Sequence, residues 1–542
     1  MTEPARHPAI QPTAAEMRLV IAASTAGTVF EWYDFFIYGT LAAIIGHTFF
    51  PAGNATLQTL LVWATFAVGF GFRPLGAMLF GYFGDKLGRK YTFLVTVTLM
   101  GIATAGVGFV PSTDRIGLAA PLIIVFLRVL QGLALGGEYG GAAIYVWEHS
   151  PPEKRGFYTG FIQTSAIAGF TLSVAVVLSC KALMTPEDWT AWGWRVPFLL
   201  SVLLLAISLW MRLKLSESPV FKAMKEEGEI SGNPFLESMT YPGNAKRLFV
   251  AMIGCTAGMT VLFYTAMFYM LSFLKGPMRL DDTMADLFTG IAALLGMAGN
   301  VWVGKLSDRI GRKRPPVFGY VAALLLLFPL FHIIGNAANP SLAATSEKYP
   351  VVIAGPDCNF SPFANEQATP CGKLIADLAG SGVTYQLNAA PELALSVGGT
   401  AVTLDAYPWT DKVARTKQLK AWLGTFGYNL DKVKPSAANS AIIIGCILLL
   451  VLLVCATYGG LAAQLCEMFP ARIRYSSMSI PYHFGSGYFG GFLPLIASYI
   501  VAKSGNPYAG LWYTWVVVAV ALAVAMWGLK GGPPRAYADD AA

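Results

Sequence analysis

The chain has 542 residues, of which 55% are hydrophobic and 13% are charged. Soluble domains contain about 25% charged residues, so this composition excludes an ordinary soluble protein and predicts a polytopic membrane protein. The net charge of +7 does not indicate a nucleic-acid partner, because the basic residues lie in short tracts between apolar segments. We therefore expect a lipid bilayer as the surroundings of the chain and no nucleic acid.

Apolar segments of about 20 residues, the length that crosses a bilayer, recur along the whole chain. The first of them is too long and too acidic at its centre for a signal peptide and is predicted to be a retained span. Twelve membrane-spanning helices are expected near 20–46, 57–83, 92–110, 118–147, 157–181, 194–213, 247–274, 284–304, 316–335, 438–466, 476–503 and 508–529.

Basic residues predict the orientation of these helices. Lys and Arg gather in the connections at 84–91, 148–156, 212–247, 305–315 and 467–475. Connections rich in Lys and Arg stay in the cytoplasm, so both termini are predicted to be cytoplasmic.

Two motifs occur twice. GYFGDKLGRK at 81–90 returns as GKLSDRIGRK at 304–313, and EHSPPEKR at 148–155 shares its Glu, Pro and Arg spacing with EMFPARIR at 467–474. The repetition predicts two six-helix halves. The two copies of the second motif lie farther apart in the sequence than the two copies of the first. The second half must therefore contain an insertion between its third and fourth helices, at 336–437.

The polar insertion at 336–437 contains short β-branched runs, Gly and Pro turns and one helix-like segment, which predicts a small extracytoplasmic α/β element. Cys358 and Cys371 are expected to form a disulfide there, since that side of the membrane permits one. Three roles stay open for the insertion: a lid, a partner-binding surface, or none.

These observations divide the chain into seven predicted parts. They are a cytoplasmic N-terminus (1–19), the N-terminal six-helix bundle (20–213), a cytoplasmic central loop (214–246), the first three helices of the C-terminal bundle (247–335), the insertion (336–437), the last three helices (438–529) and a cytoplasmic tail (530–542).

Several of these motifs resemble those of a known family. GYFGDKLGRK resembles the G-x-x-x-D-x-x-G-R-K loop motif of the major facilitator superfamily. The metabolite:proton symporter family of that superfamily is matched more closely, by EWYDFFIYG (31–39), GFRPLGAMLFGYFGDKLGRK (71–90), RVLQGLALGGEYGGA (128–142) and WGWRVPF (192–198).

The resemblance implies an all-α membrane protein with the major facilitator fold, whose two six-helix repeats hold the substrate between them. It also implies a multi-pass protein of the bacterial inner membrane that is a monomer, is not an enzyme and needs no cofactor or metal. The insertion departs from the short outer loop usual in the family.

Strongly ionisable residues inside the predicted spans are few: Glu31, Asp34, Arg73, Arg128 and Glu138. A charge at the bilayer centre costs about 2.5–3.5 kcal/mol, so each should face the bundle interior and find a partner. We expect the three carboxylates to serve proton coupling, with Glu31 or Asp34 as the proton carrier. The alternative is a buried ion-pair network that contacts no ligand.

Arginine is always charged and matches a carboxylate with two parallel hydrogen bonds, which makes Arg73 and Arg128 the expected clamps for an anionic group. In the second half, His332 and His483 are the ionisable residues expected in the spans. The full set of expected substrate-binding residues is Tyr38, Arg73, Arg128, Gln131, Tyr264, Gln464, Tyr482 and His483.

The repeated loop motifs are expected to form a latch that links the two halves on the cytoplasmic side. An Asp there can accept from a helix N-terminus, and an Arg can pair with a carboxylate. The alternative is that the basic residues only determine topology. The expected latch residues are Asp85, Arg89, Lys90, Glu148, Arg155, Asp308, Arg312, Lys313, Glu467 and Arg474.

The predicted function is proton-coupled symport of a small organic acid, such as a mono-, di- or tricarboxylate, by alternating access. Two alternatives remain: a proton symporter for betaine- or proline-type zwitterions, and a non-transporting sensor on the same fold. Protons and an anionic or zwitterionic small molecule are thus the expected partners. An ATP-driven pump is disfavoured because no G-x-x-x-x-G-K-[ST] motif is present.

Overall fold

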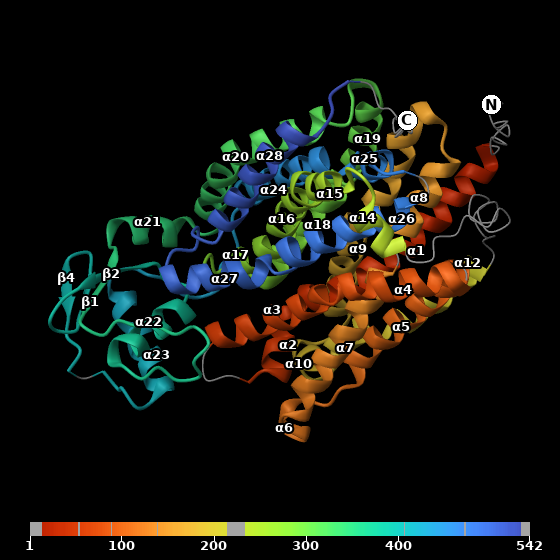
Figure 1. The fold of residues 1–542 in the computed structure, drawn as a ribbon. Coiled ribbons are helices and arrows are strands. Elements are labelled where there is room, and N and C mark those ends of the chain that lie inside the picture. Colours follow the sequence, from red (N-terminus) through yellow and green to blue (C-terminus); the bar gives the residue numbers. More distant parts are fainter. Residues whose placement is uncertain are drawn as a thin grey trace, which may run out of the picture.

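The computed structural model describes residues 14–51, 55–87, 89–137, 139–213, 234–405, 407–470 and 473–532. Long helices form a bundle, and a small sheet lies at one end of it (Figure 1). We call the end with the sheet the outer end. The opposite end, where α8, α19 and α25 lie, is called the inner end.

The first half of the bundle extends to Leu213. Its main helices are α1 (Ala14–Thr40), α2 (Ala42–Phe49), α3 (Ala55–Gly71), α4 (Arg73–Leu87), α5 (Arg89–Phe109), α7 (Ala119–Gly136), α8 (Tyr139–His149), α9 (Arg155–Leu183), α11 (Val196–Leu199) and α12 (Ser201–Leu213). Short helices α6 (Thr113–Ile116) and α10 (Pro186–Ala191) lie in its connections.

The second half begins with the short helix α14 (Pro234–Thr240). Its bundle contains α15 (Asn244–Phe249), α16 (Gly258–Tyr264), α17 (Met270–Lys275), α18 (Asp282–Gly296), α19 (Ala298–Ile310), α20 (Arg314–Ala338), α24 (Ala437–Tyr458), α25 (Leu461–Met468), α26 (Arg474–Phe484), α27 (Leu493–Ser504) and α28 (Leu511–Gly528). Three π-helical stretches interrupt it: η3 (Val250–Ala257), η4 (Thr265–Tyr269) and η6 (Gly485–Gly491).

Among the described residues, ten continuous helical stretches are long and apolar enough to cross a membrane. A shorter apolar helix, Leu94–Phe109, lies between two of them. Large apolar side chains such as Phe109, Leu122 and Phe318 are exposed. Exposed apolar surface on so many helices is what a lipid-embedded protein presents to the acyl chains.

Glycines bring helices α3, α4 and α7 into backbone contact. A Cβ on Gly132 would meet the carbonyl of Gly69, and a Cβ on Gly136 would meet the carbonyl of Arg73. Small residues of this kind allow membrane helices to approach closely. The contact determines how far apart Arg73 and Arg128, which lie on α4 and α7, can be.

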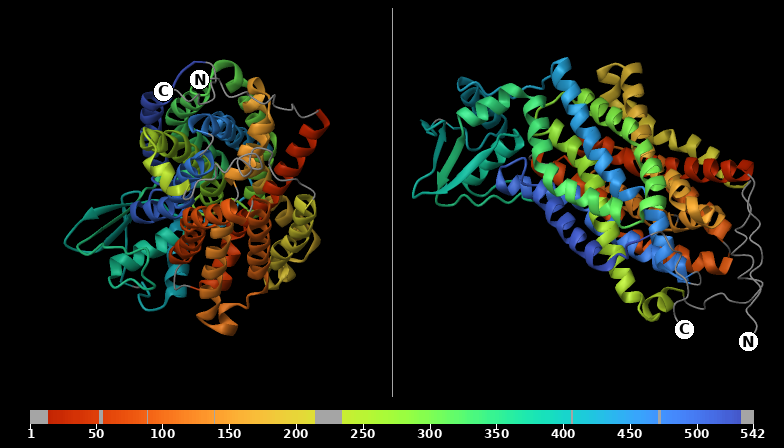
Figure 2. Two further views of the ribbon diagram at one scale, coloured as in Figure 1. Left: turned by 45° about the vertical axis from the view of Figure 1, so that its right-hand side comes forward. Right: turned by 90° about the horizontal axis from the view of Figure 1, so that it is seen from above.

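Residues 340–425 fold into a module of their own. Strands β1 (Val351–Gly355), β2 (Tyr385–Ala389), β3 (Ala394–Val397) and β4 (Thr400–Val402) form one sheet in the order β2-β1-β3-β4. The module's helices are α21 (Pro340–Lys348), α22 (Pro370–Gly380) and α23 (Lys412–Thr425). Strand β1 runs parallel to β2 and antiparallel to β3. Side chains from the sheet, α22 and α23 form a hydrophobic core apart from that of the bundle, as the two views of Figure 2 show for the backbone.

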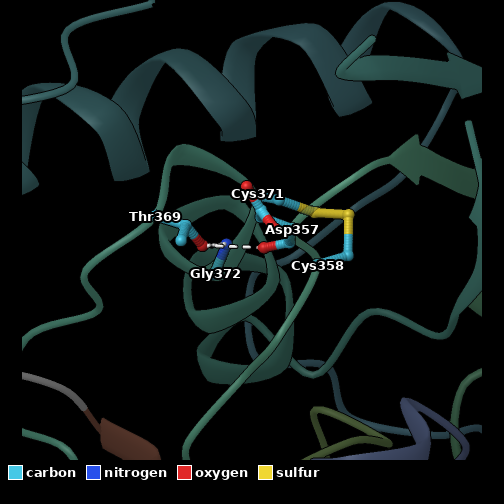
Figure 3. The surroundings of a disulfide bond; sticks show 5 residues. All are labelled: Asp357, Cys358, Thr369, Cys371 and Gly372. Carbon is cyan, nitrogen blue, oxygen red and sulfur yellow. Dashed lines mark hydrogen bonds between the residues drawn. A yellow bond between two sulfur atoms is a disulfide. The ribbon is translucent and has the colours of Figure 1, made fainter. Parts of the chain in front are cut away.

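Cys358 and Cys371 form a disulfide at the start of α22 (Figure 3). Thr369 caps this helix, because its hydroxyl accepts from the Gly372 N–H at 3.0 Å and donates to the Asp357 carbonyl. The disulfide and the Thr369 cap together hold the loop after β1 against α22.

A buried ion pair lies inside the module. The Arg415 Nε donates to Asp377 Oδ2 at 2.8 Å, and the Tyr407 hydroxyl donates to the same oxygen at 2.9 Å. Burial and the neighbouring carboxylate raise the pKa of Tyr407. Both Asp377 and Arg415 are almost fully buried, so neither can exchange its partner for water.

We expect Asp377→Ala to destabilise the module. Removing one partner of a buried pair leaves an uncompensated charge and costs about 3–5 kcal/mol. Limited proteolysis of the purified full chain should show new cleavage within 340–436. The matched control is Asp431→Ala, which breaks the exposed pair with Lys420 and should change cleavage little. Equal protease resistance of both variants would contradict the prediction.

Candidate functional site

Arg73 is a fully buried cation at the interface of the two halves. It opens α4 directly after the break at Phe72, and Pro74 follows it at a position where a missing N–H is tolerated. Its guanidinium lies over the rings of Trp32, Phe70 and Tyr482, with Cζ at 5.5, 5.2 and 5.7 Å from the centroids. Among the described residues, none accepts a hydrogen bond from any of its three nitrogens.

Arg128 is a second fully buried cation, and it lies on α7, which packs against the helix of Arg73. Its Nη1 donates to Gln131 Oε1 at 2.6 Å, while the Gln131 amide donates to the Thr104 hydroxyl at 2.7 Å. The rings of Phe35 and Tyr38 lie 4.1 and 4.6 Å from Cζ. Its Nε and Nη2 have no acceptor within the described part of the chain. Gln131 therefore positions Arg128 and has little hydrogen-bonding capacity left for a ligand.

The second half contributes polar side chains that face Arg73. Tyr264 lies close enough to both guanidinium groups to interact with their charge. Tyr482 stacks its ring against Arg73 and its hydroxyl lies 3.4 Å from that of Tyr458. His483 is fully buried beside Arg73, and neither ring nitrogen has a partner among the described residues.

The two carboxylates of α1 are both buried, Glu31 at 2% exposure and Asp34 at 5%. Within the described residues no ion pair joins Asp34 to Arg73 or Arg128. The Asp34 carboxylate lies beside Ser201 of α12. Asp34 therefore does not belong to an ion-pair network with the arginines, because its side chain turns toward α12.

Two further site residues were expected. Glu138 is outside the described residues. Gln464 is buried on α25, one turn before Glu467, in a helix of the inner end.

An aromatic plug separates the arginines from the outer end. We define it as Trp63, Phe66, Tyr264 and Phe268. Trp63 packs on Phe66 at 5.5 Å between centroids, and Phe66 packs on Phe268 at 5.3 Å. Gly39 allows this contact, because a Cβ there would collide with the Phe268 ring. The plug joins the two halves, since Trp63 and Phe66 come from α3 while Tyr264 and Phe268 come from α16 and η4.

At the inner end, Asp308 of α19 caps a helix of the other half. Its two carboxylate oxygens accept from the backbone N–H groups of Gly156 and Phe157 at 2.7 and 2.8 Å. Charge and helix dipole both favour this contact. A Cβ on Gly156 would collide with the Gly304 carbonyl, so only glycine allows α9 and α19 to come this close.

Arg312 connects this cap to the next helix. It pairs with Asp308 at 2.8 Å and holds Glu467 with two bonds, from Nη2 at 2.7 Å and Nε at 3.0 Å. These carboxylates raise the pKa of Arg312, although burial alone would lower it.

The second pair of repeated motifs also meets at the inner end. Arg474 of the second half lies 3.8 Å from Glu148 of the first. Trp147 lies between Arg474 and Arg155, with Cζ atoms 4.4 and 3.7 Å from its ring. Glu148 therefore pairs across the halves with Arg474, whereas Glu467 pairs with Arg312 inside the second half.

The remaining expected latch residues are Asp85, Arg89, Lys90 and Lys313. The side chains of Asp85, Arg89 and Lys90 lie outside what the structure describes. Lys313 donates to the Met526 carbonyl at 2.6 Å. That bond stays within the second half, so the assignment of Lys313 to a contact between the halves is wrong.

A buried acid in the second half escaped the sequence analysis. Asp286 of α18 is 1% exposed and pairs with Lys275 at 2.5 Å and with Lys181 of the first half at 3.5 Å. The expectation that only His332 and His483 are buried there is wrong, since His332 is exposed and stacks on Tyr508. Asp286 lies inside the predicted span 284–304, and an acid within an apolar segment was the available signal.

We expect Asp308→Asn to loosen the inner end. The variant loses the charge of the cap, and a bond to a charged group is worth about 1.5–3 kcal/mol. A cysteine at Thr159, buried one turn beyond Gly156, should then react with a permeant maleimide about tenfold faster. Labelling of the same variant without the cysteine at Thr159 measures the reaction of the native cysteines, which is subtracted.

Asp281→Asn is the matched control, because Asp281 caps α18 within the second half. Asp286→Asn should leave the labelling rate at Thr159 unchanged or lower it, since it breaks a contact at the other end. Equal labelling in Asp308→Asn and Asp281→Asn would show that Asp308 does not hold the halves together.

Comparisons with known proteins agree with this geometry. The family model described as "Sugar (and other) transporter" matches residues 19–242. The shikimate transporter of Escherichia coli (strain K12) is 38% identical over 314 residues, covering 57% of this chain and 70% of that protein. The glycine betaine/proline/ectoine/pipecolic acid transporter OusA of Dickeya dadantii (strain 3937) is 37% identical over 330 residues, covering 59% of this chain.

The chain spans 65% of the length of OusA. A solved structure of the proton:xylose symporter XylE bound to 6-bromo-6-deoxy-D-glucose matches with a TM-score of 0.58 at 14% identity, covering 95% of this chain and 96% of that one. At this identity the match shows the fold. The chain belongs to the major facilitator superfamily of transporters and, within it, to the metabolite:proton symporter family.

Proposed function

We propose that this protein is a proton-coupled symporter of a small organic acid that works by alternating access. In this proposal twelve helices span the bacterial inner membrane, both termini are cytoplasmic and the sheet module is extracytoplasmic. The single observation that carries the substrate class is Arg73, a buried cation none of whose nitrogens has an acceptor among the described residues.

The unused hydrogen-bonding capacity at the centre consists largely of donors. Arg73 offers three nitrogens and Arg128 offers Nε and Nη2. A buried donor without a partner costs about 1–3 kcal/mol, more when it is charged. A substrate with one or more carboxylate groups would remove this cost by accepting from both guanidinium groups.

The contacts at the inner end support the transport cycle. Asp308 and Arg474 close that end between the halves, and Arg312 holds Asp308 in place, while Asp286 and Lys181 pair across the halves at the outer end. Opening either end requires one set of charged contacts to separate. Such a two-state arrangement is what alternating access of the two halves needs.

A second candidate is a betaine- or proline-type zwitterion, which OusA and the proline/betaine transporter of Escherichia coli (strain K12) take as their printed names state. Asp34 favours it, since its Oδ1 has no partner among the described residues. Against it, the aromatic faces beside the arginines are already covered by guanidinium groups. Few faces remain there for a quaternary ammonium.

Uptake into proteoliposomes under an imposed pH gradient should therefore show accumulation of a carboxylate from a panel of shikimate, 2-oxoglutarate, proline and glycine betaine. Arg73→Ala and Arg73→Lys should each reduce it at least about tenfold, because lysine lacks the planar fork. Arg128→Ala should abolish carboxylate uptake while the protein stays in the membrane. Arg195→Lys is the control, since the bonds of Arg195 within the described part of the chain go to the carbonyls of Gly108 and Val110.

The outcomes of this screen separate the candidates. Accumulation of glycine betaine or proline alone would establish the zwitterion carrier. If none of the panel moves or binds, the non-transporting sensor becomes the better account. Uptake that survives in Arg73→Ala would refute the role of Arg73.

We expect Asp34→Asn to uncouple transport from protons. A carboxylate that alternates between charged and neutral forms can carry the proton, whereas an amide cannot. The variant should still exchange internal for external substrate but no longer concentrate it under a pH gradient. Glu31→Gln is compared in the same assay, and Asp114→Asn, an exposed acid, is the control. Concentrative uptake by Asp34→Asn would transfer the role to Glu31.

A further inference from the structure

A cavity of about 430 Å³ opens at the outer end between the two halves and the sheet module. The first half contributes residues of α1, α2 and α3, and the second contributes α17, α27 and the turn before α18. Residues 379–383 of the module and Lys432 complete the lining. Neither Arg73 nor Arg128 belongs to it, because the aromatic plug lies between.

Arg279 attaches the module to the second half. Its φ of 55° is the only positive φ of a non-glycine residue in the described chain. In this conformation the Arg279 carbonyl accepts from the Val433 N–H at 2.8 Å, and its guanidinium donates from Nε to the Ser381 carbonyl at 3.1 Å. An αL conformation costs an L-residue about 1–3 kcal/mol, which these contacts offset.

Further contacts tie the module to α27. Lys503 donates to the Phe360 carbonyl at 2.6 Å, and the Tyr385 hydroxyl donates to the Ala502 carbonyl at 3.1 Å. Toward the first half, the contact is close packing, where a Cβ on Gly380 would lie 4.0 Å from that of Ala55. The module is therefore a wall of the cavity that belongs to the second half.

The charged residues in the lining are three cations and one anion: Lys275, Arg279, Lys432 and Asp282. Lys275 is neutralised by Asp286 and Lys432 by Asp282, at 2.5 and 2.9 Å. Within the described residues no carboxylate comes within 4 Å of the Arg279 guanidinium, whose bonds go to a neutral carbonyl. Asp431 acts on the charge of Arg279 from beyond this distance, but Asp431 is itself paired with Lys420. Arg279 thus leaves a net positive charge in the cavity.

The remaining lining suits a small organic molecule. Trp63 and Tyr269 supply ring surface, and Thr40, Thr59 and Ser272 supply hydroxyl groups. Mostly apolar walls with a few polar groups are typical of small-molecule sites of this size.

We propose that this outer cavity is a second, separate binding site for a small carboxylate, held by Arg279 and walled by the sheet module. Its ligand class rests on the proposed function, since the same substrate would pass through it. The positive charge of Arg279 attracts anions into a cleft with low-dielectric walls. The carboxylate is held there until the plug opens.

Charged thiol reagents test the potential of the cavity without any transport assay. A cysteine at Thr59, which is exposed and lines the cavity, is labelled in right-side-out vesicles with an anionic or a cationic methanethiosulfonate. The labelling rate with the anionic reagent is divided by the rate with the cationic reagent. This ratio should be about tenfold higher at the Thr59 cysteine than at a Thr190→Cys control, which lies on exposed α10. Higher salt should diminish this preference.

Arg279→Gln should remove the preference and Arg279→Lys should keep it, since only the first removes the charge. Lys432→Gln should change it little, because Lys432 is already paired. If Arg279→Gln and Arg279→Lys lower the ratio alike, the charge of Arg279 is not its cause and the proposal is overturned.

Protection of the Thr59 cysteine from labelling by a bound ligand distinguishes the outer site from the central one. Millimolar 2-oxoglutarate should slow labelling of the Thr59 cysteine in an Arg73→Ala background, where the central site is disabled. Loss of protection in that background would show that the cavity holds no site of its own. Protection that persists when the transport screen fails would leave the outer site standing without the proposed function.

Discussion

Two guanidinium groups that cannot shed their charge are buried where the halves meet, and much of the structure serves to accommodate them. Arg73 and Arg128 cannot neutralise themselves by losing a proton, as a buried lysine or carboxylate can. Aromatic rings cover both cations, and Gln131 holds one of them in place. In the proposed function, an anionic substrate accepts from the donors that remain unused.

The same constraint explains the glycine contacts around the arginines. Two charged groups on neighbouring helices can act on one small ligand only if the helices nearly touch. Gly69 and Gly132 bring α3 and α7 into such contact, and Gly39 lets Phe268 pack over the site from the other half. Packing of backbone and ring thus determines both the spacing of the cations and their seclusion from water.

Charged contacts between the halves lie at both ends of the α9 seam. Asp308 caps α9 at its first residues, and Lys181 near the last turn of α9 meets Asp286. Between these points the seam is packed by small side chains such as Gly160 and Gly290. One helix therefore carries a separable contact at each end, which suits a motion that opens the ends in turn.

Sequence reasoning worked where local spacing carried the information. The repeated motifs predicted residues at the inner end, where Asp308 bonds the other half and Arg312 bonds Asp308. It failed where the partner comes from a distant helix. Spacing shows that Glu31, Asp34 and Tyr38 are close on one helix, but not that Tyr38 meets Arg128 while Asp34 turns to α12. Asp286 lies inside a predicted span, so the sequence could show a buried acid there, but not its lysine partners on two other helices.

The sequence by itself determined the class of this protein. Apolar runs, charge asymmetry and repeated motifs follow from the bilayer, which imposes its thickness and polarity on every span. Only the tertiary structure decided which charges meet, that Arg73 and two nitrogens of Arg128 are left without acceptors among the described residues, and that the sheet module walls an outer cavity. These features depend on the distances between helix faces, and packing of side chains from the whole chain determines those distances.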